Sequence, residues 1–405
     1  MLYRNKTMKK VLILGGGFAG VDAAIHLRKM NYQVTLVSNR DYFYIYPTSI
    51  WIPTGESKFE DMCVPLADLQ QAHGFELVID EVTSIKTKES KVYCKENTFE
   101  YEYLIIAMGS GKVKHEGNEH FLSICGAPEE SIKIKERIDA LIEKGSGKIA
   151  MGFGGNPKDP SNVRGGPAFE VLFNVDNQLR GLGIRENFEL TFFAPMPEPG
   201  ARMGKQALKM MDVFFKRLNI NTHFGKKITK FKEDGIVFED ESKLESDFTM
   251  FIPAGSGHNV FENSDLPLNE AGLIQINDYC EVVHDFDEST KSEDGIYKVF
   301  AIGDSAALQG PDWRAKQGHI AEVMAKNAAF NIDMMNKGSQ ERKGYRDHLN
   351  ILCVMDSGNG AAFVYRNDKG GKMIPMPVFG HWMKKGWGWY CRNSKLGKIP
   401  RIPGM

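Results

Sequence analysis

The sequence predicts an α/β protein made of two nucleotide-binding units followed by a different C-terminal segment. Near the N-terminus, the apolar strand "KKVLILGGG" is followed by a helical stretch and a second strand over Tyr32–Ser38, which is the order found in parallel sheets. A second unit of this kind runs from about Lys148 to about Phe251. From Ile351 onward the pattern changes. Together these observations predict two Rossmann-like dinucleotide-binding domains and a distinct C-terminal segment.

The chain of 405 residues, 42% of them hydrophobic, is long enough for two or three domains. We expect residues 8–115 and 270–345 to form the first Rossmann-like domain, because nucleotide-binding character returns at "KVFAIGDSAA". Residues 116–269 would form the second one, and residues 346–405 the C-terminal segment. Residues 1–7 have the character of a polar leader, after which Met8 offers an alternative start.

Composition excludes several classes of protein. The net charge of −1 gives no indication of nucleic-acid binding. No apolar run is long enough to span a bilayer, and glycines interrupt the apolar run that follows Met8, so we interpret it as a strand and not a signal peptide. Six cysteines without a CxxC pair argue against a structural metal site and against a secreted disulfide scaffold.

The stretch "GGGFAG" matches the glycine loop GxGxxG between a strand and a helix. In this motif Gly15 would permit the tight turn, and Gly17 would let the backbone approach a pyrophosphate. Gly20 would allow close packing of helix on strand, with Phe18 and Ala19 opening the helix. The phosphate would then bind at the N-terminus of this helix.

Further glycines and polar residues complete the expected cofactor site. Ser38 and Asn39 stand where an acidic ribose ligand is usual, so a hydroxyl and an amide would bind the ribose, or affinity lies elsewhere. Gly109 ends a strand, as loops over a cofactor often do. Gly303 and Asp304 follow another strand, where the carboxylate would bind a ribityl hydroxyl or cap a following helix. Two such distant elements favour FAD over NAD.

The second unit has an interrupted loop, "GFGGNPKDPSNVRGGPAFE", at residues 152–170. A dinucleotide loop needs closely spaced glycines followed directly by a helix. Here Asn156-Pro157, Asp159-Pro160 and a second glycine pair intervene. The loop therefore raises the question of which molecule supplies electrons.

Several segments in collinear order resemble sulfide:quinone oxidoreductases, which are related to flavocytochrome c sulfide dehydrogenases and single-subunit NADH dehydrogenases. The most particular of these segments are "KFEDMCVPLADL", "FLSICGAPEES", "GGPAFE" and "CVMDSGNGAAF". The resemblance implies tightly bound FAD that takes electrons from sulfide or a related sulfur species and passes them to a membrane quinone. In that case the second unit would keep its architecture without binding a nicotinamide.

The resemblance also implies a role for two cysteines. Cys353, in "LCVMDSGNG", matches the redox cysteine near the C-terminus, and Cys125, in "SIC", matches a cysteine that some members attach to the flavin. Arg164 stands where the family has a second redox cysteine, and its guanidinium could hold an anionic substrate instead. Three interpretations stay open: Cys125 is the partner of Cys353, a single cysteine releases sulfur to an acceptor, or the donor is not sulfide.

Glu170 matches a family carboxylate that serves proton transfer, although it could also only satisfy the N-terminus of the helix that begins near Pro167. Lys316 precedes a helix that starts near Gly318 and should point at the flavin, where a positive charge stabilises the reduced form. A surface role for this lysine is the alternative.

The C-terminus interleaves Trp382, Trp387 and Trp389 with lysines and arginines. This pattern favours a lipid surface, and the resemblance implies a membrane-dipping segment that lines the quinone site. The alternative is a helix that docks on its own protein or a partner subunit, and Gly386 and Gly388 should weaken any helix. We therefore expect a peripheral protein of the cytoplasmic membrane, with a homo-oligomer left open.

Two alternatives to sulfide oxidation remain at this point. An NADH:quinone oxidoreductase of the single-subunit type would need an intact second glycine loop and an acidic residue after the next strand, where Glu198 comes only after two prolines. A divergent flavoprotein without sulfide chemistry, such as a sensor, would keep the fold alone.

Overall fold

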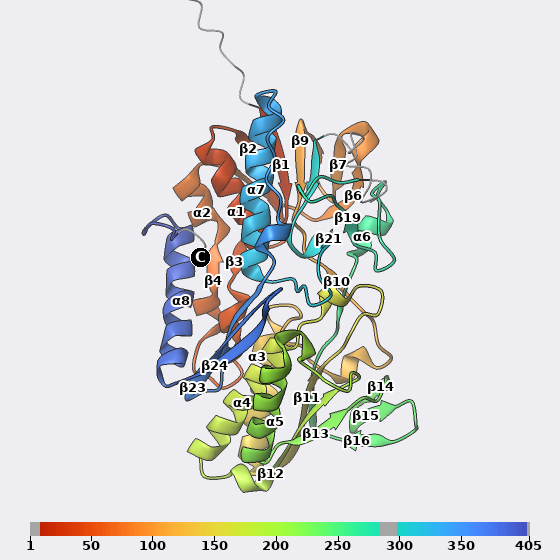
Figure 1. Cartoon of the computed structure of the whole chain (residues 1–405), viewed down its shortest axis with the longest axis vertical. Helices are drawn as coiled ribbons and strands as arrows, with labels where there is room; N and C mark the ends of the chain where they lie inside the picture. The colour runs from red at the N-terminus through yellow and green to blue at the C-terminus, as the bar shows by residue number, and fades with distance from the viewer. Residues whose placement is uncertain (1–8, 284–297, 403–405) are drawn as a thin grey trace, which may run out of the picture.

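A five-stranded parallel sheet carries the glycine loop in the computed structural model, which describes residues 9–283 and 298–402 (Figure 1). The strand order is β20-β9-β1-β2-β5. Every residue of β1 after Lys10 is buried, as expected for a central strand covered on both faces. The strands are β1 (Lys10–Leu14), β2 (Gln33–Ser38), β5 (Glu76–Ile79), β9 (Tyr103–Ile106) and β20 (Val299–Ala301).

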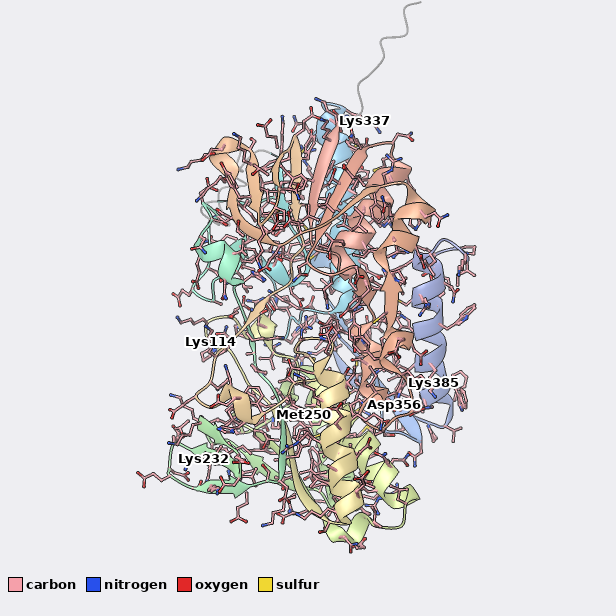
Figure 2. All side chains as sticks on the ribbon, turned by 180° about the vertical axis from the view of Figure 1, so that it is seen from behind. Lys114, Lys232, Met250, Lys337, Asp356 and Lys385 are labelled. Atoms are coloured by element: carbon pink, nitrogen blue, oxygen red, sulfur yellow. The ribbon has the colours of Figure 1, made fainter. Side chains whose placement is uncertain are left out.

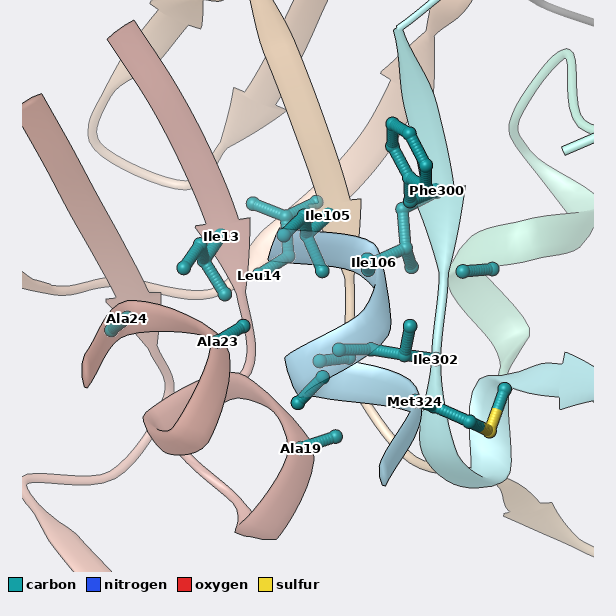
Figure 3. Packing of buried hydrophobic residues seen from close by; sticks show 14 of the residues in the cluster. Ile13, Leu14, Ala19, Ala23, Ala24, Ile105, Ile106, Phe300, Ile302 and Met324 are labelled. Atoms are coloured by element: carbon teal, nitrogen blue, oxygen red, sulfur yellow. The ribbon is translucent and has the colours of Figure 1, made fainter. Parts of the chain in front are cut away.

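Two helices, α1 (Phe18–Lys29) and α7 (Gly318–Asn336), pack side by side on this sheet (Figure 1). Small side chains allow the close approach: Ala19 and Ala23 of α1 lie in the same buried cluster as Ile302 and Met324 (Figure 3). The start of each helix is therefore fixed by the core of the first sheet. The predicted leader and residues 284–297 of the predicted first domain lie outside the described residues.

The second unit is a four-stranded parallel sheet with the order β13-β12-β11-β17. Phe169 stacks on Phe192 with ring centroids 4.2 Å apart, which joins a helix to the sheet. The strands are β11 (Gly147–Phe153), β12 (Phe188–Ala194), β13 (Asn221–Phe224) and β17 (Phe248–Ile252), and the helices are α3 (Glu130–Lys144), α4 (Gly166–Gly181) and α5 (Lys205–Arg217). The α/β class is confirmed, while the exact domain boundaries stay a prediction.

Short elements connect these units. They are β3 (Tyr42–Tyr44), β4 (Cys63–Pro65), α2 (Leu66–His73), β6 (Val82–Lys86), β7 (Lys91–Cys94), β8 (Thr98–Glu100), β10 (Gly111–Lys112), β14 (Ile228–Lys232), β15 (Gly235–Phe238), β16 (Lys243–Glu245), β18 (Gly255–Ser256), α6 (Asn259–Glu262), β19 (Ile274–Gln275) and β21 (Ala306–Ala307).

The C-terminal segment is an antiparallel sheet of three strands followed by one helix. The elements are β22 (Ile351–Asp356), β23 (Gly360–Asn367), β24 (Gly370–Pro377) and α8 (Phe379–Lys395). Seen from behind, α8 runs along the edge of the molecule with Lys385 near Asp356 (Figure 2). Within residues 9–283 and 298–402, no helix combines the length and the apolar character needed to cross a membrane.

The distribution of polar and apolar side chains on helix α8 is the opposite of that on an ordinary surface helix. The side facing the protein carries charged residues, and the side facing outward carries large apolar ones. The buried residues with ionisable side chains are His381, Lys384 and Lys395, and the outward apolar residues are Phe379, Trp382 and Trp389, with exposed fractions of 69%, 64% and 62%. Ion pairs therefore dock this helix, and its apolar face is left without a partner among the described residues.

A buried charge cluster fixes the C-terminal end of α8 to the first unit. Lys395 Nζ lies 2.6 Å from Asp22 Oδ1 in α1 and 2.7 Å from Glu322 Oε1 in α7. Burial alone would raise the pKa of Asp22, but Lys395 and Arg401 together lower it below its usual value. The two helices that begin at the glycine elements are thus both tied to α8.

Gly386 and Gly388 both lie within the continuous helix α8, and Gly388 allows close packing, because a Cβ there would lie 2.7 Å from Thr48 Cγ2. One expectation from the sequence is wrong. No α-helix directly follows Asp304. A single 3-10 turn and β21 come next, and Gln317 is the N-cap of α7, so Asp304 does not cap that helix.

Candidate active site

The first glycine loop has the shape that a pyrophosphate site requires. Gly15 has φ +110°, and a Cβ at Gly20 would lie 1.9 Å from the carbonyl oxygen of Gly15. A Cβ at Gly17 would meet no atom within 4 Å, so open space lies beside the first turn of α1. No side chain caps this helix, which leaves its N–H groups free for an anion.

The second cofactor element lies against the first. A Cβ at Gly303, which has φ +64°, would lie 3.1 Å from Cβ of Ala19, and one at Gly318 would lie 3.7 Å from the Phe18 ring. Gly109, with φ +79°, again leaves open space. Segments distant in sequence thus converge on one cradle, and these residues fit FAD.

The two polar residues at the end of β2 differ in availability. The Ser38 hydroxyl donates to the Arg40 carbonyl oxygen at 2.7 Å and accepts from the Arg40 N–H at 3.2 Å. Ser38 therefore holds the turn, whereas the Asn39 side chain is exposed and free to meet a ribose.

Positive charge gathers at Asp304. Arg164 forms an ion pair with its carboxylate, and Lys316 Nζ donates to its backbone oxygen at 2.8 Å. Burial and the nearby charge of Arg164 lower the pKa of Lys316 to about 7 and that of Lys112 to about 8. When protonated, these lysines add positive charge, which suits the phosphates of a cofactor and the negative charge of a reduced flavin.

The second loop is filled by contacts of its own. Asn156 Nδ2 donates to the Gly255 oxygen in β18 at 2.9 Å, and Asp159 accepts from the backbone N–H of Ser161 at 2.9 Å. The amide nitrogen of the buried Asn162 has no partner among the described residues. These polar groups are mostly engaged within the protein, unlike those of an open nucleotide loop.

Cys353 lies on β22 next to a buried ion pair. Glu170 of α4 and Lys384 of α8 form this pair, and both side chains are less than 10% exposed. Burial, together with the charge of Glu170 and against the charge of Lys384, raises the pKa of the Cys353 thiol to about 12. Burial also raises the pKa of Glu170, despite the opposing effect of Lys384. A neutral thiol therefore lies within the electrostatic influence of both Glu170 and Lys384.

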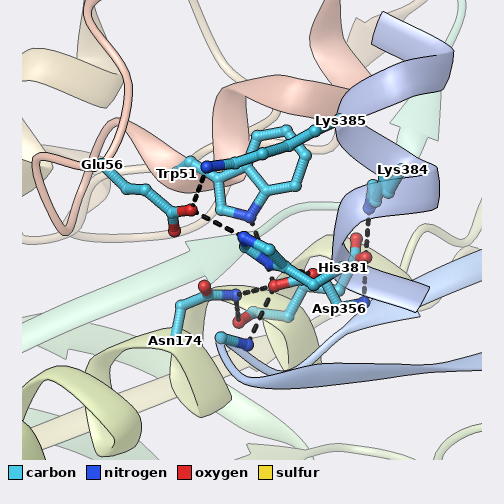
Figure 4. Close-up of polar contacts among 9 residues, drawn as sticks. Trp51, Glu56, Asn174, Asp356, His381, Lys384 and Lys385 are labelled. Carbon is cyan, nitrogen blue, oxygen red and sulfur yellow. Dashed lines mark hydrogen bonds and ion pairs between the residues drawn. The ribbon is translucent and has the colours of Figure 1, made fainter. Parts of the chain in front are cut away.

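Asp356 links this pair to a network of polar contacts (Figure 4). Its backbone N–H donates to Glu170 Oε1 at 2.8 Å, and its carboxylate accepts from Trp51 Nε1 at 3.2 Å and Asn174 Nδ2 at 3.1 Å. The other carboxylate oxygen lies 2.7 Å from His381 Nδ1. Because Glu170 is buried and paired with Lys384, satisfying a helix terminus is not its only role.

The other predicted cysteine lies in a different environment. Cys125 is a buried free thiol, and it contributes with Arg164 to the electrostatic environment of Lys112 and Tyr46. The neighbours that shift the pKa of Cys353 are Glu170 and Lys384 instead. The structure thus brings Arg164 together with Asp304 and Lys316, and Glu170 together with Cys353.

Sequence reasoning missed four residues of this site. Lys384 was counted only as part of a basic segment and His381 was given no role, although their spacing places them on one helix face. Asp356 follows Cys353 by three residues, and Lys112 carried no motif. Only the tertiary contacts show that these side chains serve the site.

An α/β fold with a glycine-lined cradle that fits FAD, next to a second nucleotide-type unit, is typical of a flavin-dependent oxidoreductase. The chain belongs to the pyridine nucleotide-disulphide oxidoreductase family, whose model matches residues 9–327. The family implies FAD as the cofactor.

Individual similar proteins show which members of this family the chain resembles. The chain is 29% identical over 374 residues to a sulfide-quinone reductase of Aquifex aeolicus, covering 88% of this chain and 83% of the relative. A type II NADH:quinone oxidoreductase of Staphylococcus epidermidis is 22% identical, with coverage of 90% and 92%. The solved sulfide:quinone oxidoreductase of Aquifex aeolicus superposes with a TM-score of 0.84 at 23% identity, covering 98% and 93%. The resemblance to sulfide:quinone oxidoreductases is confirmed.

Proposed function

We propose that this protein is a FAD-dependent sulfide:quinone oxidoreductase, which takes two electrons from sulfide or a related sulfur species and passes them to a membrane quinone. The observation that carries this proposal is the Cys353 thiol next to the buried Glu170–Lys384 pair and beneath α8. The similarity to sulfide-quinone reductase supports it. The proposed FAD-binding domain comprises residues 8–115 and 270–345.

Cys353 would form the bond to sulfur. Its thiol is neutral at physiological pH, so it must lose a proton as it reacts, and Glu170 is placed to accept it. Joining the thiol to hydrosulfide gives a persulfide, one proton and two electrons. Bound FAD supplies the two-electron redox chemistry that links this donor to the quinone.

Arg164 cannot form the second sulfur bridge, so we propose that Cys353 works alone. Arg164, Lys112 and Lys316 would instead supply the positive charge that draws an anionic donor and stabilises negative charge at the cofactor. In this proposal Cys125 is not the redox partner, and its attachment to the flavin stays open.

The outward face of α8 would rest on the membrane surface. Its tryptophans and Phe379 are exposed, while the charges beneath them are paired with the protein. Aromatic rings favour the interface between headgroups and acyl chains, and the nearby lysines favour anionic headgroups. This arrangement would bring a quinone dissolved in the membrane close to Lys384 and Glu170.

NADH:quinone oxidoreduction is the second candidate, because several similar proteins carry that name. The loop between β11 and α4 speaks against it, since its polar groups contact β18 and the loop itself. Glu198, the acidic residue that this candidate would need after β12, is exposed and follows two prolines.

The two candidates differ in the donor that reduces the flavin. The purified holoprotein is mixed without oxygen with sulfide or with NADH in separate cuvettes, and the flavin absorbance is followed before a short-chain quinone is added. We expect sulfide to bleach the flavin and quinone to restore its absorbance. Bleaching by NADH alone would establish the second candidate.

A further inference from the structure

A row of three side chains runs from the surface to the buried ion pair of the site (Figure 4). Asp356 is fully buried, and its Oδ2 lies 2.7 Å from His381 Nδ1. The other ring nitrogen of His381 lies 2.8 Å from Oε1 of Glu56, whose side chain is partly exposed. Lys385 lies 2.5 Å from the same oxygen at the outer end.

The geometry of His381 requires an additional proton in this row. A neutral imidazole has one N–H and one lone pair, so it can satisfy only one of two carboxylates. Both ring nitrogens of His381 face carboxylate oxygens. With the second proton on the ring, His381 is a cation that balances the charge of Asp356.

The inner end of the row is coupled to Glu170. The Asp356 backbone N–H donates to Glu170 Oε1 at 2.8 Å, and Asn174 Nδ2 donates both to the Glu170 carbonyl oxygen and to Asp356 Oδ1. The two carboxylates are therefore close neighbours. Burial raises the pKa of Glu170, Lys384 lowers it, and the negative charge of Asp356 adds to the rise.

The charged and titratable groups around Asp356 and Glu170 come from α8, β22, α4 and the loop after a 3-10 turn. They are Lys384, Lys385 and His381 on α8, Cys353 and Asp356 on β22, Glu170 on α4, and Glu56 after the 3-10 turn Tyr46–Trp51.

We propose that His381 is a positioning residue that sets the proton affinity of Glu170 by cancelling the charge of Asp356. Glu170 then exchanges its proton in a range suited to the reduction of a quinone, which takes up protons together with electrons. The role of Glu170 in quinone reduction rests on the proposed quinone reductase activity. The coupling between His381, Asp356 and Glu170 does not depend on that activity.

Infrared titration of the holoprotein tests the coupling directly. The carbonyl band of protonated Glu170 is assigned by its loss in Glu170→Gln, and its midpoint is then measured against pH in variants. His381→Gln leaves Asp356 unbalanced, so the midpoint should rise by about one pH unit. Asp356→Asn removes the negative charge, so the midpoint should fall by a similar amount. A control variant, His120→Gln, should leave it unchanged, because this partly exposed histidine lies elsewhere.

Shifts in opposite directions cannot come from a general loss of packing. Equal directions in both variants, or no shift in either, would overturn the coupling. Glu56→Gln provides a second test if His381→Gln does not fold. Without the Glu56 carboxylate, the second proton on His381 is less favoured, so the titration midpoint of Glu170 should rise.

The pH profile of quinone reduction should move with the infrared midpoint of Glu170, and a profile that stays fixed would overturn the role of Glu170 in that reaction. Because the infrared midpoint needs no turnover, it separates failure of this inference from failure of the proposed activity.

Discussion

Replacing Cys353 by serine is expected to lower the rate of quinone reduction by sulfide by about 10³-fold or more, because the variant loses its covalent nucleophile. A serine hydroxyl does not form the bond to sulfur. Reoxidation by quinone of flavin reduced with dithionite should stay within about twofold of the original rate, since Glu170 and Lys384 remain paired.

The matched control for this variant is Cys94→Ser. Cys94 is also a partly buried free thiol, but it lies on β7 in another sheet. Its replacement should leave the sulfide-dependent rate unchanged. A Cys353→Ser variant that keeps this rate would show that the sulfur bond forms elsewhere.

Replacing Trp382 and Trp389 together by alanine is expected to weaken binding to lipid vesicles by about 100-fold. The two rings are 64% and 62% exposed and lie on the outward face of α8. Burial of an aromatic side chain contributes roughly 1.5–3 kcal/mol, and each 1.4 kcal/mol changes affinity about tenfold. Co-sedimentation with vesicles containing anionic lipid measures the effect.

Leu182→Ala is the control for this pair, because Leu182 is 54% exposed but follows α4 in the second unit. It should bind vesicles as the original protein does. If the double tryptophan variant also binds unchanged, the apolar face of α8 does not meet lipid.

The cofactor cradle could be predicted from the sequence because its residues act through the local backbone. Gly15, Gly17 and Gly20 follow a strand and open a helix, which fixes their geometry within a few residues. Gly303 could be predicted in the same way, because it follows a strand in the stretch "FAIGD". The α/β class followed from the same strand and helix periodicity.

The polar part of the site could not be predicted in this way. Lys384 and Glu170 are far apart in the sequence, and only the docking of α8 brings them together. The glycines of α8 were expected only to weaken a helix, because the sequence does not show that Thr48 packs against Gly388. Charged residues in a basic segment also look solvated until their buried partners are known.

We propose that Cys353 alone carries the sulfur, because the resemblance to sulfide:quinone oxidoreductases matches Arg164, and not a cysteine, to the position of the family's second redox cysteine. The most direct test is peptide mass spectrometry of the holoprotein after anaerobic reaction with sulfide, under conditions that preserve persulfides. We expect one added sulfur atom on the peptide that contains Cys353 and none on the peptide that contains Cys125. A sulfur bridge between these two cysteines, or no added sulfur on Cys353 after the flavin has been reduced, would contradict the claim.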